Sequence, residues 1–199
     1  MSPIDKLSAL FEKFPGIGPR QARRFVQYLL VAAPALRGEI AEAVRSLGAQ
    51  TAQCKKCYRW FPTEDSASTA STCAVCANTA RERTLLFVVE KDADIDNVER
   101  SGYKGLYFVL GGIIPLASEE PEKHIRLREL LKRVEADKPV EIILGLSATT
   151  EGDHTRQILA EKLQKSTSKV SSLGRGLSTG SELEYADPDT IAQALGNRH

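Results

Sequence analysis

The stretch that decides the fold is Cys54-Lys-Lys-Cys57 together with Cys73-Ala-Val-Cys76. These two C-x-x-C pairs contain all four cysteines of the 199-residue chain, and fifteen residues separate the pairs. Two residues between cysteines allow a tight turn to direct both sulfurs at one ion, and two such pairs at this separation have the spacing of a four-thiolate zinc site. We therefore predict one structural Zn²⁺ per chain. Its ligands would be Cys54, Cys57, Cys73 and Cys76.

Two disulfides or four unrelated thiols are the alternatives to a metal. The insert between the pairs is rich in Ser, Thr and Ala and cannot bury a core of its own, so a bound ion would supply folding free energy that this segment lacks. Disulfides need an oxidising compartment. The first residues show no basic stretch leading into an apolar run, so we expect no signal peptide and a cytoplasmic, nucleoid-associated protein.

The charge of the chain is unevenly distributed although its net value is only +1. Residues 1–60 hold ten Lys or Arg against four acids, a net charge of +6, and the remainder carries −5. A basic segment on an acidic body favours contact between that segment and a polyanion. Surplus charge on solvated helices is the alternative interpretation.

The turn Phe14-Pro-Gly-Ile-Gly-Pro-Arg20 separates two helical patterns, over residues 3–13 and from Pro19 to Leu30. Its glycines accept backbone conformations closed to other residues, and Pro19 suits the first turn of a helix. The free N–H groups at that helix start are then available to a phosphate. This pattern is typical of a helix-hairpin-helix unit with sequence-independent, salt-sensitive DNA binding; an ordinary helical hairpin is the alternative. The candidate DNA-binding residues are Gly16, Gly18, Arg20, Arg23 and Arg24.

A third helical pattern covers residues 36–47 and is predicted to end at Gly48 as its C-cap. Trp60 and Phe61 follow the first cysteine pair, and we expect both to pack against the zinc site; stacking on bases is the alternative.

The chain changes character after Cys76. Near-continuous apolar runs at residues 85–89, 106–110 and 140–144, with a fourth strand expected at 169–173, are typical of strands buried on both faces of a parallel sheet. Helical patterns over 92–101, 121–134 and 152–163 alternate with them, which predicts an α/β domain. A final helix is expected to open at Asp187-Pro188.

Carboxylates follow two of these strands. Glu90 ends the first strand, and Glu151 and Asp153 follow the third, where they could flank Mg²⁺. This arrangement resembles the Toprim domain of topoisomerases, primases and certain nucleases. The resemblance places Ser147 and Thr149 where that family has two metal-binding aspartates. Because a hydroxyl cannot supply the charge that gathers Mg²⁺ beside a phosphate, we expect the fold without the catalysis.

The order of these segments resembles the RecR family of bacterial recombination mediators over nearly the whole chain. The most specific pieces are residues 15–19, the four cysteines, 88–90, 105–107, 150–152 and 183–185. The resemblance implies a non-enzymatic DNA-repair protein that forms a ring-shaped homotetramer around DNA. It further implies that this protein works with RecO or RecF to load RecA onto single-stranded DNA. The family's DNA-contacting basic positions fall on Arg20 and Arg24.

The predicted fold class is α+β with several domains. They are a helix-hairpin-helix head at 1–53, a four-cysteine zinc finger at 54–77, a Toprim-like parallel-sheet domain at 82–166, and a strand and helix tail with a degenerate Walker-like segment at 167–199. No lysine follows the glycines of the tail, so we expect no ATP hydrolysis. The rival to a DNA-clamping mediator is a Mg²⁺-dependent Toprim nuclease or phosphotransferase using Glu90, Glu151 and Asp153. A protein-interaction scaffold that never touches DNA is a third possibility.

Overall fold

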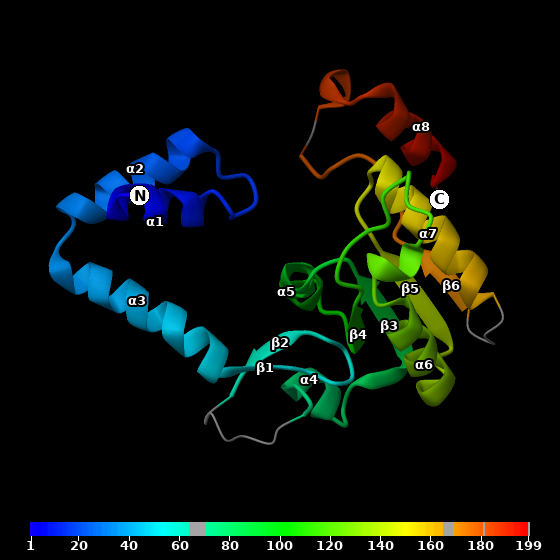
Figure 1. Cartoon of the computed structure of the whole chain (residues 1–199). Coiled ribbons are helices and arrows are strands. Elements are labelled where there is room, and N and C mark those ends of the chain that lie inside the picture. Colours follow the sequence, from blue (N-terminus) through cyan, green and yellow to red (C-terminus); the bar gives the residue numbers. More distant parts are fainter. Residues whose placement is uncertain (64–70, 165–168, 181, 199) are drawn as a thin grey trace. The chain divides into compact units, whose positions relative to one another are not determined.

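The computed structural model describes residues 1–63, 71–164, 169–180 and 182–198 (Figure 1). The chain divides into two compact units, one made of Met1–Thr51 and Pro62–Ser68 and the other of Ala52–Phe61 and Thr69–His199. Within the described residues, no helix is both long and apolar enough to cross a membrane.

The first unit is built from helices α1 (Pro3–Phe11), α2 (Pro19–Val31) and α3 (Pro34–Ala49). Ser2 and Asp5 form a reciprocal capping box at the start of α1. Gly16 lies in the turn between α1 and α2 with a φ of +77°, a conformation that other residues rarely adopt. The rings of Phe11 and Phe25 meet edge to face at 5.7 Å and help to pack α1 against α2.

The predicted end of the third helix at Gly48 is wrong. The helix continues to Ala49, and Gln50 caps it by donating its backbone N–H to the carbonyl of Ser46 at 2.8 Å. Apart from its chain neighbours and the backbone of α3, nothing lies within 4 Å of the position that a Cβ on Gly48 would take, so this glycine is an ordinary helical residue in the last turn.

The cysteine-bearing segment contains strands β1 (Thr51–Gln53) and β2 (Trp60–Pro62), which pair in a two-stranded sheet, and the short helix α4 (Ala74–Ala77). The turn between the strands carries Cys54 and Cys57, and α4 carries Cys76 with Cys73 as its N-cap. The fold therefore brings two distant C-x-x-C pairs to one place.

A four-stranded parallel sheet in the order β4-β3-β5-β6 forms the centre of the second unit. Its strands are β3 (Glu82–Val89), β4 (Gly105–Val109), β5 (Glu141–Gly145) and β6 (Lys169–Ser172). Alternate side chains of β3 face two separate cores: Leu86 and Val88 enter the larger one, and Phe87 and Val89 enter the smaller. This double burial explains why the strands read as continuous apolar runs.

Helices cover the two faces of this sheet. α5 (Asp92–Arg100) contributes Ile95 to the smaller core, whereas α6 (Leu127–Asp137) and α7 (Thr150–Leu163) contribute to the larger one. The predicted parallel sheet and its crossover helices are confirmed. The single helix predicted from residue 121 is wrong: a 3-10 turn, η1 (Pro121–Lys123), comes first, and α6 begins only at Leu127. The backbone N–H of Arg126 donates to the carbonyl of Leu110 at 2.9 Å, which binds this linker to the sheet before the helix starts.

The tail after β6 contains the 3-10 turn η2 (Leu183–Tyr185) and helix α8 (Pro188–Gly196). The side chain of Asp187 accepts the backbone N–H of Thr190 at 2.9 Å, so α8 opens where the sequence predicts. Asn197 donates its side-chain amide to the carbonyl of Arg175 at 2.7 Å and holds the end of α8 beside the residues that follow β6.

Candidate functional site

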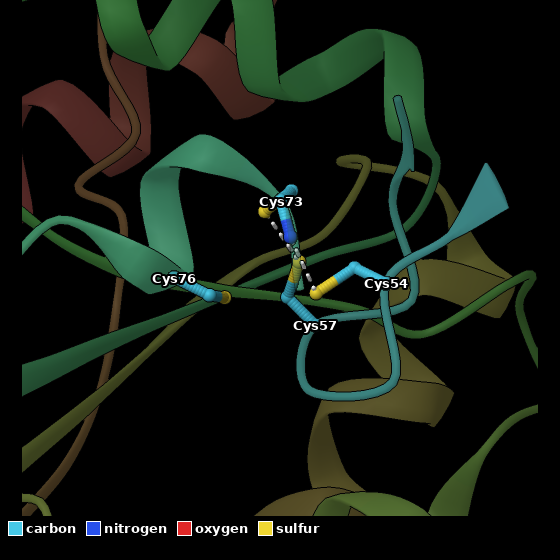
Figure 2. Close-up of side chains that lie close together, drawn as sticks. All are labelled: Cys54, Cys57, Cys73 and Cys76. Atoms are coloured by element: carbon cyan, nitrogen blue, oxygen red, sulfur yellow. Dashed lines mark hydrogen bonds between the residues drawn. The ribbon is translucent and has the colours of Figure 1, made fainter. Parts of the chain in front are cut away.

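The four cysteines form one buried cluster in the second unit (Figure 2). Their sulfurs all lie within 4.8 Å of one another, and each residue is at most 2% exposed. All four thiols are free, and the Sγ atoms of Cys57 and Cys73 are 3.6 Å apart, well beyond the roughly 2.05 Å of a disulfide. Among the described residues this is the one group of Cys, His, Asp or Glu with metal-site geometry. The arrangement can hold a metal ion.

The thiols influence one another strongly. Hydrogen bonds from Cys57, then Cys73 and Cys76, hold the pKa of the Cys54 thiol far below its usual value, and the backbone N–H of Cys73 also donates to Cys54 Sγ at 3.4 Å. The same sharing raises the pKa of Cys57 because its proton is bound by Cys54. Buried sulfurs that share protons in this way provide the thiolate set that a soft divalent cation prefers.

The first cysteine turn also docks on the edge strand of the parallel sheet. The backbone N–H of Val109 donates to the carbonyl of Cys57 at 2.8 Å. Tyr58, which has a φ of +63°, packs its ring edge to face on Phe108 at 5.4 Å. The guanidinium of Arg126 lies 5.3 Å from the centroid of the Tyr58 ring, and its Nη1 donates to the carbonyl of Val109 at 3.0 Å. The cysteine cluster is thus tied to β4 by backbone and side-chain contacts together.

Glu90, the carboxylate at the end of β3, is already satisfied within the protein. It is 7% exposed, accepts the hydroxyl of Ser147 at 2.8 Å and pairs with Lys91 Nζ at 3.0 Å. Burial raises its pKa, but the bonds from Ser147 and Lys91 outweigh that effect and leave the pKa below the usual value. The other residue at an aspartate position, Thr149, uses its hydroxyl to cap α7 by accepting the N–H of Gly152 at 3.1 Å.

Asp153 is held by two arginines rather than left open for a cation. Both Arg175 and Arg156 donate to its carboxylate. The hydrogen bonds from Arg175 lead these effects and lower the pKa of Asp153 to about 2. Glu151 contributes its backbone carbonyl, which accepts the hydroxyl of Thr155 at 2.7 Å. In the described part of the chain these three acids do not gather into a metal site, and Glu90 and Asp153 each have a cationic partner.

The candidate DNA-binding residues lie together at the start of α2 in the first unit. Gly18 is the N-cap and no side chain occupies the cap, so the first N–H groups of the helix are free of such a partner. Arg20, Arg23 and Arg24 are all exposed, and α2 contains no acidic residue. Arg23 lies 4.0 Å from the carboxylate of Asp5, a weak pair between exposed groups.

Sequence reasoning missed Arg126 and Arg175 and misplaced Trp60. Arg126 and Arg175 each follow a loop and bind a partner far away in the chain, and no local periodicity marks them. Trp60 was expected to pack against the cysteine cluster; Phe61 does so, but Trp60 is 56% exposed. The alternation of side chains along a strand would have separated the two, since neighbours point to opposite faces.

Comparison with known proteins agrees with this architecture. A family profile described as "Toprim domain" matches residues 84–174, and one described as "RecR, C-terminal" matches residues 176–199. The fold and cysteine cluster therefore define a Toprim-domain protein of the recombination class. Proteins named Recombination protein RecR are 38% identical in Bifidobacterium longum subsp. infantis, 39% in Prochlorococcus marinus and 34% in Chloroflexus aggregans. These matches cover 98–99% of this chain and 93–94% of the relatives.

The chain belongs to the RecR family of recombination proteins, which confirms the resemblance inferred from its motifs. The relatives are named as recombination proteins and not as enzymes, in line with the prediction of a protein without enzymatic activity. The α+β class, the parallel sheet of a Toprim domain and the four-cysteine cluster are confirmed. The DNA-binding role of the helical hairpin and the domain boundaries stay predictions.

Proposed function

We propose that this protein is a recombinational DNA-repair mediator that binds DNA without sequence preference and acts as a ring-shaped clamp. With RecO or RecF it would help to load RecA onto single-stranded DNA. Membership of the RecR family supports this role, and the surface at the start of α2 is the observation that carries the DNA-binding part of it. Such a protein would work in the cytoplasm at the nucleoid. We propose the same four-part division of the chain, at 1–53, 54–77, 82–166 and 167–199.

The start of α2 has the features of a phosphate-binding helix end. The positive end of the helix dipole coincides with free N–H groups and with three exposed arginines. The close approach of a phosphate is eased because Gly16 and Gly18 carry no side chain, and a Cβ at either position would meet nothing within 4 Å. Contacts of this kind read the backbone of DNA and not its bases, so they fit a clamp that must move along any sequence.

We propose Zn²⁺ as the ion held by the four cysteines. Four thiolates saturate a tetrahedral site and leave no position for a substrate, so the ion would be structural. Because the cluster is bonded to β4 through Cys57 and Val109, zinc would stabilise the edge of the Toprim sheet as well as the cysteine turns.

We propose that the protein forms a homo-oligomer, and that this is a tetramer as in the RecR family. The reason is that the first unit has too little core to be stable alone. Its buried side chains among the described residues are Ser8, Ala22 and Val26. Helices α1, α2 and α3 instead line an apolar groove of about 580 Å³, in which Val44 remains 64% exposed. Small units with so little buried area are usually completed by association. A second copy covering this groove would supply that area.

The carboxylates at the sheet edge are proposed as partner-binding or vestigial metal residues. The Toprim family binds metal at the positions of Glu90, Glu151 and Asp153. Here Lys91 neutralises Glu90 and Arg175 neutralises Asp153, which favours a binding surface over a catalytic metal site. RecO or RecF is the proposed partner for this edge.

The test is DNA binding across a salt series on zinc-loaded protein in the presence of Mg²⁺, with the DNA length checked afterwards. Affinity should fall steeply with salt and collapse in the Arg20→Glu/Arg24→Glu variant. Arg45→Glu reverses one charge on exposed α3, so it is the matched control for Arg20→Glu alone and should weaken binding far less than that variant. Unchanged affinity and salt slope in the double variant would favour the protein-interaction scaffold instead.

A further inference from the structure

Trp60, the one tryptophan of the chain, lies on the surface of the second unit with 56% of its area exposed. Along β2, Trp60 is exposed and Phe61 is half-buried against the cysteine cluster. Because successive side chains of a strand point to opposite faces, the anchoring of Phe61 directs the indole outward. A single exposed apolar side chain is common on proteins, so its surroundings must decide what Trp60 can bind.

The backbone around Trp60 is held firmly. Its N–H donates to the carboxylate of Asp92 at 2.5 Å, and the preceding carbonyl, that of Arg59, accepts the N–H of Cys54 at 2.9 Å. The guanidinium of Arg59 lies 3.8 Å from the carboxylates of both Asp92 and Asp96. The backbone that carries the indole is therefore fixed, so little backbone entropy would be lost when a flat ligand stacks on it.

Two exposed lysines lie close to Trp60 in the chain. Lys55 and Lys56 are exposed on the cysteine turn, and residues 52–62 contain no acid. Lys55 follows Cys54 in the chain, and Trp60 follows Arg59. Because the backbones of Cys54 and Arg59 are hydrogen-bonded to each other, the Cα atoms of Lys55 and Trp60 are no more than about 13 Å apart. In the described segments neither lysine forms an ion pair, whereas the nearby acids Asp92 and Asp96 are engaged by Arg59.

We propose that Trp60, Lys55 and Lys56 form a second nucleic-acid contact, which binds single-stranded DNA by stacking a base on the indole. Every base offers a flat face, so such stacking needs no sequence, and the lysines take the neighbouring phosphates. A duplex hides the faces of its bases, so this contact selects unpaired strands. The inference rests on the proposed DNA-binding function and adds to it a site on the other unit and a preferred form of DNA.

The emission of Trp60 reports on this site directly, since the chain has no other tryptophan. Full-length zinc-loaded protein is titrated with an oligothymidylate and with a mixed-sequence duplex of equal length. We expect strong quenching by the single strand and little by the duplex. Trp60→Ala should weaken single-strand binding by about 5- to 140-fold, the range found when a stacking aromatic is removed, and Trp60→Phe should weaken it less.

Leu116→Ala is the matched control, because Leu116 is equally exposed on the same unit and should leave affinity unchanged. If the wild-type protein binds DNA and the Arg20→Glu/Arg24→Glu variant does not, but Trp60→Ala binds normally and indole emission stays constant, this inference fails while the proposed function stands. If the wild-type protein binds no DNA at all, the proposed function fails first. An emission shift that follows protein concentration without DNA would assign Trp60 to a contact between copies and overturn the inference.

Discussion

Arg126 offers the sharpest test of how the cysteine cluster and the Toprim sheet depend on each other. Its guanidinium donates to the carbonyl of Val109 at 3.0 Å and lies 5.3 Å from the centroid of the Tyr58 ring. Arg126→Ala removes a charged hydrogen bond, contributing about 1.5–3 kcal/mol, and a cation–π contact of about 1 kcal/mol. Because Arg126 is only half-buried, we expect a net loss of about 2–3 kcal/mol in the free energy of unfolding.

The assay is urea and thermal unfolding of zinc-loaded protein followed by far-UV circular dichroism, with zinc release to a chelator measured in parallel. A loss of that size corresponds to a Tm lower by roughly 4–12 °C and should be accompanied by faster zinc release. Arg126→Lys keeps the charge but loses the planar fork, so it should fall between wild type and alanine.

The control is Arg128→Ala, which removes an arginine that is 77% exposed and paired with Glu122 at 2.6 Å. Exposed pairs contribute about 0–1 kcal/mol, so this variant should unfold nearly as wild type does. If Arg126→Ala is no less stable than Arg128→Ala and releases zinc at the same rate, the contacts of Arg126 are unimportant for the link between the cluster and β4. The backbone bond from Val109 to Cys57 and the packing of Tyr58 on Phe108 would then carry the connection.

Three further predictions concern the second unit. Because Arg175 lowers the pKa of Asp153 to about 2, below its usual 3.8, their bond stabilises the fold above about pH 4 and is lost as the pH falls toward 2; Asp153→Asn should remove that acid dependence from unfolding curves. Leu130 is fully buried in the larger core, so Leu130→Ala should lower the free energy of unfolding in urea by about 2–5 kcal/mol. Gly152→Ala should destabilise the protein by about 1–3 kcal/mol in the same measurement, because an added Cβ would overlap the backbone carbonyl of Ser147.

Matched variants separate these effects from general damage. Leu116→Ala alters a leucine that is 55% exposed and should change stability by less than about 0.5 kcal/mol. Gly48→Ala adds a Cβ with open space in a helix interior and should stabilise α3 by about 0.5–1 kcal/mol. Equal losses for Leu130→Ala and Leu116→Ala, or for the two glycine variants, would contradict the packing described for the second unit.

Most of the α/β domain could be predicted from the sequence because its determinants are local. A strand covered on both faces must be apolar at every position, and Leu86 to Val89 satisfy that requirement on alternate faces. The helix from residue 121 was mispredicted because residues 121–123 form a separate 3-10 turn and the backbone N–H of Arg126 bonds to Leu110 and not to a preceding helical turn. Gly48 was mispredicted because a glycine near a helix end need not be its cap.

For the sites, the spacing of Cys54, Cys57, Cys73 and Cys76 predicted a common cluster, because two residues between cysteines fix the turn that directs their sulfurs. The replacement of the Toprim aspartates by Ser147 and Thr149 could also be predicted from the sequence, since the residue type at those positions decides the charge available to a metal.

The sequence by itself determined the order of the segments, the strands of the sheet, the cysteine cluster and the family to which the chain belongs. Only the tertiary structure decided that Arg175 neutralises Asp153, that Arg126 joins the cysteine turn to β4, and that Trp60 faces outward. The physical reason is the separation along the chain between the residues in contact. Periodicity and motif spacing record contacts between residues a few positions apart, whereas the partner of a long side chain depends on which distant loops the packed sheet brings within its reach.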